Sequence, residues 1–143
     1  MSPPIVADTG GLLRALARTA SGEPSFPDYE TILTSASFII VPGIVLVEVD
    51  YFLRENPFAM RKLLSEIFDP RTRYQYESPI PADIARALEL DARFKDLNLG
   101  LVDGMVAAVA ERRRVYRVLT TDRRDFSAIR VGPHLARPLE LVP

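Results

Sequence analysis

Four acidic residues of this chain lie inside or beside apolar runs, where charged side chains are uncommon. They are Asp8 after Pro4–Ala7, Glu48 within Ile44–Leu53, Asp103 in Val102–Ala110, and Asp122 after Val118–Thr121. Burying a carboxylate is costly unless it is hydrogen-bonded, paired or bound to a metal. Because no lysine lies in any of these runs, the four acids together predict one acidic pocket that holds a divalent cation.

Each acid taken singly has an ordinary structural alternative. Asp8 and Asp122 follow strand-like runs, where an aspartate often caps the next helix. Asp103 would complement the dipole of a helix that begins beside it, and Glu48 would pair with a buried arginine. A nearby acid, Asp125, is expected to cap a turn rather than to bind a ligand.

Glu48, rather than the neighbouring Asp50, is predicted to face the acidic pocket because of its helical neighbours. The residues three and four positions away from Glu48 are all apolar: Ile44, Val45, Tyr51 and Phe52. Its side chain is therefore expected to face inward from a helix that is apolar almost all round and buried. Asp50 instead has Arg54 at the i+4 position, on the more polar side of that helix.

Short apolar strands alternate with helices along the chain. Strands are expected at Pro4–Ala7, Phe38–Val41, Arg73–Glu77, Val118–Thr121 and, at an edge, Leu139–Val142. Helices are expected at Leu12–Ala20, Asp28–Ser35, Ile44–Glu55, Pro57–Phe68, Pro81–Phe94 and Val102–Arg113. This alternation predicts a single α/β domain over residues 1–143, with a central parallel sheet of four to five short strands flanked by helices on both sides.

Such a sheet explains why distant acids would meet. Ligands of open parallel sheets bind in the crevice beyond the carboxyl ends of the strands. Asp8 and Asp122 each follow a strand, and Asp103 lies in the first turn of a helix. We therefore expect these three acids at one edge of the sheet, with Glu48 facing them from its helix.

Composition excludes several other kinds of site. The chain has 143 residues, 48% of them hydrophobic, so a packed core is expected rather than disorder. The absence of cysteine excludes a thiolate zinc site and a cysteine nucleophile. His134, the one histidine, lies in a loop-like stretch unsuited to a Ser-His-Asp triad. No apolar run reaches the roughly 18 residues of a membrane helix and no signal peptide is evident, so a cytoplasmic protein with no membrane association is expected.

The four acidic segments resemble those of a PIN domain, specifically a VapC-type toxin ribonuclease. The matching segments read IVADTGGLLRAL, VPGIVLVEVDYFL, LGLVDGMVAAVAERR and VLTTDRRDF, in the order in which the family carries its acids. The resemblance implies a parallel sheet between helices and an endoribonuclease activity that depends on Mg²⁺ or Mn²⁺. It also implies an RNA substrate, frequent homodimers and a cognate antitoxin.

The resemblance implies catalytic roles for Asp8, Glu48, Asp103 and Asp122. We assign the direct metal contacts to Asp8 and Asp103, because Mg²⁺ is typically held by one or two carboxylates together with substrate phosphate. Glu48 and Asp122 would bind a second ion or orient water near the first. No protein nucleophile is needed, since a metal ion activates water for attack on the phosphate.

RNA must also be held by its phosphates, and arginine suits that role. Arg123 and Arg124 follow Asp122 directly and are expected to contact phosphate. The earlier run Arg112–Arg117 is interpreted as a solvated helix end. Thr9 is expected either to hydrogen-bond a carboxylate or a phosphate, or to cap the first helix.

Three alternative functions make different demands on the sequence. A PIN-domain nuclease of RNA processing would need no antitoxin, and a non-catalytic RNA- or protein-binding module would share the fold but would have no use for four acids. A phosphatase with Asp8 as covalent nucleophile would need a second aspartate two residues later, and that position is Gly10.

Overall fold

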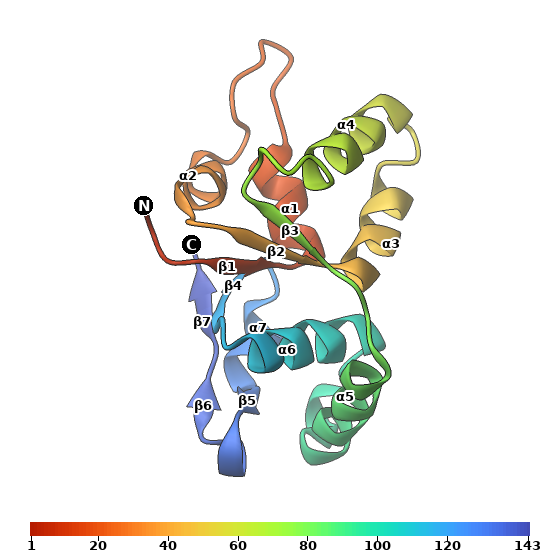
Figure 1. The fold of residues 1–143 in the computed structure, drawn as a ribbon, viewed down its shortest axis with the longest axis vertical. Coiled ribbons are helices and arrows are strands. Elements are labelled where there is room, and N and C mark those ends of the chain that lie inside the picture. The colour runs from red at the N-terminus through yellow and green to blue at the C-terminus, as the bar shows by residue number, and fades with distance from the viewer.

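A five-stranded parallel sheet with the order β3-β2-β1-β4-β7 forms the centre of the computed structural model, which describes residues 1–143 (Figure 1). Its strands are β1 (Ile5–Ala7), β2 (Ile39–Pro42), β3 (Tyr74–Glu77), β4 (Arg117–Leu119) and β7 (Glu140–Val142). Every residue of β1 and β2 is buried, as expected for continuous apolar strands covered on both faces. The predicted fold class is therefore confirmed, with five strands, and β7 is an edge strand as expected.

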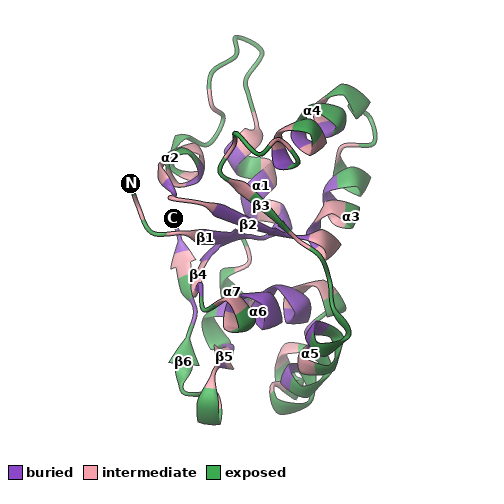
Figure 2. Cartoon of the chain, viewed as in Figure 1, coloured by how far each residue is buried: buried purple, intermediate pink, exposed green.

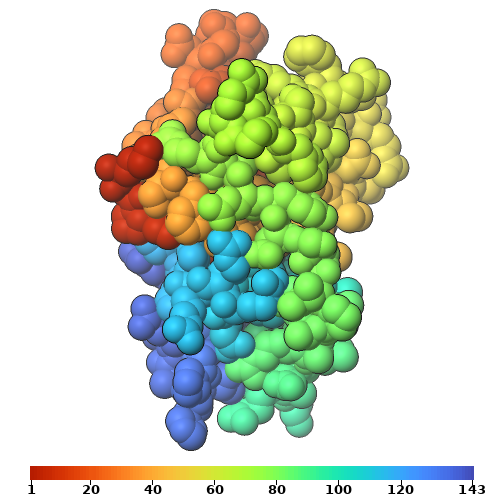
Figure 3. All heavy atoms as spheres, viewed as in Figure 1, coloured from red at the N-terminus to blue at the C-terminus, as the bar shows by residue number.

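Seven α-helices surround this sheet. They are α1 (Thr9–Leu16), α2 (Pro27–Ser35), α3 (Gly43–Phe52), α4 (Pro57–Ile67), α5 (Pro81–Arg93), α6 (Leu101–Arg113) and α7 (Arg123–Ala128). Figure 1 shows α1, α2 and α4 on one face, and α6 with α5 outside it on the other. Figure 3 shows the segment after β3 crossing the surface from the upper helices down to α5. No helix has the length and apolar character that a membrane crossing requires.

Several short elements and boundaries differ from the expectations. The first helix spans Thr9–Leu16 instead of the expected Leu12–Ala20, so both of its ends lie earlier in the chain. The sequence also did not predict the antiparallel pair β5 (Arg130–Val131) and β6 (Arg137–Pro138) or the 3-10 turns η1 (Lys95–Leu97) and η2 (Pro133–Leu135). Elements of two or three residues are too short to show a hydrophobic period. Each of these two strands is recognised only by its hydrogen bonding to the other strand.

The expectation of a buried helix at 44–55 is wrong for its outer side. In α3 only Val45 and Val49 are buried, whereas Val47 is 68% exposed and Tyr51 and Phe52 are each 63% exposed. Figure 1 places α3 beside the carboxyl ends of the strands, where α1, α6 and β2 cover one side of it. Apolar composition shows that a helix has surface to bury, but not how many partners cover it.

The central helix α6 is fixed between the sheet and α5. Its residues Gly104–Ala110 form an uninterrupted buried run, the purple segment of α6 in Figure 2. The approach to α5 is close, because a Cβ added to Gly104 would lie 2.9 Å from the Cβ of Ala87. The first turn of α6, which carries Asp103, is therefore held in place by core packing.

Ion pairs join the other end of α6 to α5 and β3. Arg112 donates two hydrogen bonds of 2.9 Å to the carboxylate of Asp83, which is 2% exposed, and Arg113 pairs with Glu77. The expectation of a solvated helix end is therefore only partly correct: Arg112 is exposed but ion-paired, and Arg113 is half-buried and ion-paired. A buried carboxylate such as Asp83 needs a cationic partner, and Arg112 supplies it.

A glycine brings α1 against the end of β4. A Cβ on Gly11 would lie 2.2 Å from the main-chain oxygen of Leu119 and 2.8 Å from the nitrogen of Thr120, and backbone atoms cannot move aside. We expect Gly11→Ala to lower the free energy of unfolding by about 2–3 kcal/mol, the usual cost of an overpacked core. Urea denaturation followed by circular dichroism measures this change.

Gly100→Ala is the matched control, because no atom lies within 4 Å of its added Cβ and its φ is negative. It should change stability by less than about 1 kcal/mol. Equal stability of the two variants would show that the contact between α1 and β4 tolerates a methyl group.

Candidate metal centre

The first acid, Asp8, lies at the carboxyl end of the central strand β1. It is 5% exposed, and its Oδ2 accepts a hydrogen bond of 2.8 Å from the hydroxyl of Thr120, which follows the adjacent strand β4. Asp8 occupies the N-cap position of α1, but its side chain makes no capping hydrogen bond. The capping alternative therefore does not account for this buried carboxylate.

Glu48 faces the same region from α3. Its Oε1 accepts a hydrogen bond of 2.6 Å from the hydroxyl of Thr9, the first residue of α1. The partner of Glu48 is thus a hydroxyl rather than a buried arginine. Of the roles expected for Thr9, the hydrogen bond to a carboxylate is the one that the structure shows. Asp50 is exposed, in agreement with its rejection from the sequence.

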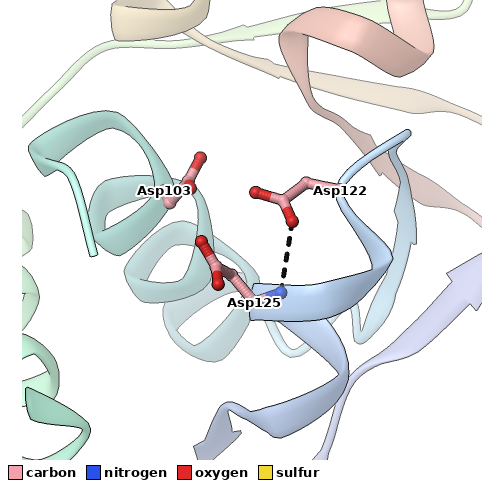
Figure 4. A group of neighbouring side chains, drawn as sticks. All are labelled: Asp103, Asp122 and Asp125. Carbon is pink, nitrogen blue, oxygen red and sulfur yellow. Dashed lines mark hydrogen bonds between the residues drawn. The ribbon is translucent and has the colours of Figure 1, made fainter. Parts of the chain in front are cut away.

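A second group of carboxylates lies where α6 meets α7. One oxygen from each of Asp103, Asp122 and Asp125 lies within 4.8 Å of the others (Figure 4). Asp122 is the N-cap of α7, and its Oδ1 accepts the main-chain N–H of Asp125 at 3.1 Å. The interpretation of Asp125 as a cap is therefore wrong: Asp122 caps the helix, and the side chain of Asp125 points toward Asp103.

Three of the four predicted acids line one open cavity of about 390 Å³. They are Asp8, Glu48 and Asp103. The other residues that line this cavity are Thr9, Gly10, Leu13, Arg14, Phe52 and Thr121. Asp122 and Asp125 adjoin the cavity through their contact with Asp103. We call the space lined by the first nine residues, without Asp122 and Asp125, the acidic cavity.

Burial and mutual repulsion disturb the ionisation of these acids. Burial raises the pKa of Asp103 to about 7, and the charges of Asp8, Asp122 and Asp125 add to the increase. Burial also raises the pKa of Asp8, with smaller contributions from Glu48 and Asp122, while the hydrogen bond from Thr120 opposes the shift. Carboxylates that repel each other in a partly desolvated site suit a hard divalent cation. Their oxygens are the ligands that such a cation prefers, and its charge would offset theirs.

The geometry groups the acids somewhat differently from the expected pair of metal contacts, Asp8 and Asp103. Asp103 lies within 4.8 Å of Asp122 and Asp125 in a group without Asp8, and it also lines the acidic cavity together with Asp8 and Glu48. Asp103 belongs to both groups and is the carboxylate that either arrangement would require. The pair Asp8 and Asp103 stays a prediction.

The predicted phosphate contacts lie on α7. Arg123 and Arg124 are both exposed, and Arg123 Nη1 donates a hydrogen bond of 3.0 Å to the main-chain oxygen of Pro143. Their role toward phosphate also stays a prediction. Arg14 and Phe52, which line the acidic cavity, were not identified from the sequence. The helical spacing of Phe52 from Glu48 could have indicated its position.

Comparison with known proteins agrees with this architecture. The family model of the PIN domain matches residues 5–132. Ribonuclease VapC26 of Mycobacterium tuberculosis is 29% identical over 132 residues, which cover 88% of this chain and 92% of that protein. The crystal structure of VapC20 of Mycobacterium tuberculosis, described as a sarcin-ricin loop cleaving toxin, shares the fold with a TM-score of 0.69 at 20% identity, covering 94% of this chain and 99% of that chain.

The raised pKa of Asp103 predicts a stability that depends on pH and metal. Between the usual aspartate pKa near 4 and the folded value of about 7, the folded state binds a proton that the unfolded state lacks. Stability therefore falls as pH rises through this window. At pH 8 we expect Asp103→Asn to stabilise the metal-free protein by about 1–2 kcal/mol, after allowance for solvent screening.

The same two proteins test the binding of metal. Millimolar Mg²⁺ or Mn²⁺ should raise the melting temperature of the wild type at pH 8, because a ligand of the folded state stabilises it by mass action. The rise should be much smaller for Asp103→Asn, and Asp50→Asn, on the exposed side of α3, should behave as wild type. Identical melting curves for wild type and Asp103→Asn at every pH and metal concentration would exclude a shared acidic site.

Proposed function

The chain belongs to the PIN-domain family, and we propose that it is an endoribonuclease that uses Mg²⁺ or Mn²⁺ in the acidic cavity. The observation that carries the proposal is the convergence of Asp8, Glu48 and Asp103 from three separate elements on one cavity. Asp122 and Asp125 add two further carboxylates beside Asp103. The name of VapC26 as a ribonuclease supports the same activity.

The chain's own residues would hold the ion and the water. A divalent cation bound among these carboxylates would make a water more acidic and offset the negative charge that develops on the phosphate. Asp103 must release its proton when a cation binds, since a carboxylate ligand is deprotonated. Thr120 fixes the orientation of Asp8, and Thr9 fixes that of Glu48, so both carboxylates are held before substrate arrives.

A non-catalytic binding module of the same fold is not favoured. Carboxylates that raise each other's pKa destabilise the metal-free protein, and binding RNA or protein gives no physical reason to retain them. They would also repel the phosphates of RNA unless a cation neutralised them. A metal-dependent reaction accounts for the cluster directly.

We further propose that the protein is the toxin of a toxin–antitoxin pair, restrained by an antitoxin protein and assembled as a homodimer. The description of VapC20 as a toxin supports this role. Exposed apolar side chains on α3 and α4 provide surface for a protein partner: Val47 at 68%, Phe58 at 72% and Phe68, just after α4, at 59%.

Cleavage of RNA tests the activity. The wild type should cleave RNA in Mg²⁺ or Mn²⁺, and EDTA should abolish the reaction. Asp8→Asn and Glu48→Gln should each lower kcat by roughly 100-fold or more, because each removes charge from the site that supports the transition state. Gel electrophoresis of a labelled RNA measures the rates.

Asp50→Asn is the matched control for Glu48→Gln, because Asp50 lies two residues away on the exposed side of the same helix. It should retain the wild-type rate. Intact RNA after prolonged incubation of the wild type with Mn²⁺ would contradict the proposed activity.

Growth of bacteria that express the protein tests the toxin role. Expression of the wild type should arrest growth, and Asp8→Asn should relieve the arrest. Co-expression of a small protein encoded beside the gene should also relieve it and should co-purify with the chain. Normal growth with active, soluble wild-type enzyme would indicate an RNA-processing nuclease without an antitoxin.

A further inference from the structure

Arg14 of α1 lines the acidic cavity without pairing with any of its carboxylates. It is exposed and is the one basic residue among the nine that line the cavity. Its guanidinium forms no ion pair and donates no hydrogen bond within the protein, whereas most other arginines near carboxylates, such as Arg112 and Arg86, are paired. Its N–H donors are therefore free to bind an anion that enters the cavity.

Two aromatic rings of the α2 region position Arg14. The guanidinium carbon lies 4.8 Å from the ring centre of Phe26 and 5.5 Å from that of Tyr29, and these rings pack edge to face. Cation–π contacts of this kind orient a guanidinium while leaving its N–H edge free. The planar fork of arginine matches two oxygens of a phosphate.

Phe52 lies on the wall of the same cavity, at the end of α3. It is four residues after Glu48, so both side chains project from one side of the helix. Its ring is 63% exposed, and an edge-to-face contact with Tyr51 at 5.4 Å supports it. An exposed, supported ring beside a polar cavity offers a face on which a flat base can stack.

On the basis of the proposed ribonuclease activity, we infer that Arg14 and Phe52 form a subsite for single-stranded RNA beside the acidic cavity. Arg14 binds a backbone phosphate next to the bond that is cut, and Phe52 stacks on an unpaired base. A base within a duplex has both faces covered by its neighbours, so stacking on Phe52 requires an unpaired strand. The acids repel phosphate, and Arg14 supplies the positive charge that the wall of the cavity otherwise lacks.

Binding of a labelled single-stranded RNA oligonucleotide, followed by fluorescence anisotropy, tests this subsite. All binding measurements use Asp8→Asn protein in Mg²⁺, so that the RNA stays intact. Adding Arg14→Ala should weaken binding about 5- to 50-fold and lower the salt-dependence slope by about 0.7, the value for one phosphate contact on a single strand. Adding Phe52→Ala should weaken binding about 5- to 100-fold and leave the salt slope unchanged.

Two control variants lie outside the acidic cavity. Arg61→Ala removes an exposed arginine of α4, and Leu88→Ala removes an apolar side chain of α5 that is 63% exposed. Neither should change the affinity for the oligonucleotide more than about twofold, since neither residue lines the acidic cavity. A duplex of the same sequence should bind without dependence on Phe52.

In the otherwise wild-type enzyme, Arg14→Ala and Phe52→Ala should raise KM more than they lower kcat. Unchanged KM and affinity in both variants, with RNA still cleaved, would overturn the subsite and leave the ribonuclease proposal standing. If no RNA is cleaved but binding depends on both residues, the subsite holds and the proposed activity fails. Loss of a protein partner with Phe52→Ala, at unchanged RNA affinity, would assign this ring to a protein interface and overturn the subsite.

Discussion

Repulsion among carboxylates at the carboxyl edge of the sheet is the constraint around which this molecule is arranged. Burial removes much of the water that would screen their charges, so the pKa of Asp103 rises to about 7 and that of Asp8 rises above its usual value. The fold carries this cost because the buried packing of β1 and α6 holds the acids together. A bound cation would remove the cost, which would link the stability of the protein to its proposed chemistry.

The scaffold holds each acid from a different element. Asp8 ends the fully buried strand β1, and Asp103 begins the helix α6, whose buried run of small residues lets it pack between the sheet and α5. Hydroxyl groups of Thr9 and Thr120 then orient the carboxylates of Glu48 and Asp8. Core packing thus sets the positions of the acids, and neutral hydrogen bonds set their directions without cancelling their charge.

The distribution of basic residues complements this arrangement. Arginines at the far end of α6 and on α5 are paired with Asp83, Glu77 and Glu111, so they join α6 to α5 and β3 rather than neutralise the acidic cavity. Arg14 is different because aromatic rings, not carboxylates, position it. This arrangement fits the proposed site, in which the unpaired acids would hold a cation and Arg14 would meet a phosphate.

The sequence by itself determined the longer elements and most of the acids, because a strand's apolar run and a helix's period are local patterns. Asp8 and Asp103 could be placed at element ends, and the parallel sheet then brought them to one edge. Only the tertiary structure decided the role of Asp125, the exposure of α3 and the presence of Arg14 at the cavity. These features depend on which elements approach one another. The approach of α6 to α7, or of α1 to α3, does not change the hydrophobic periodicity of any of these helices, so the sequence does not reveal it.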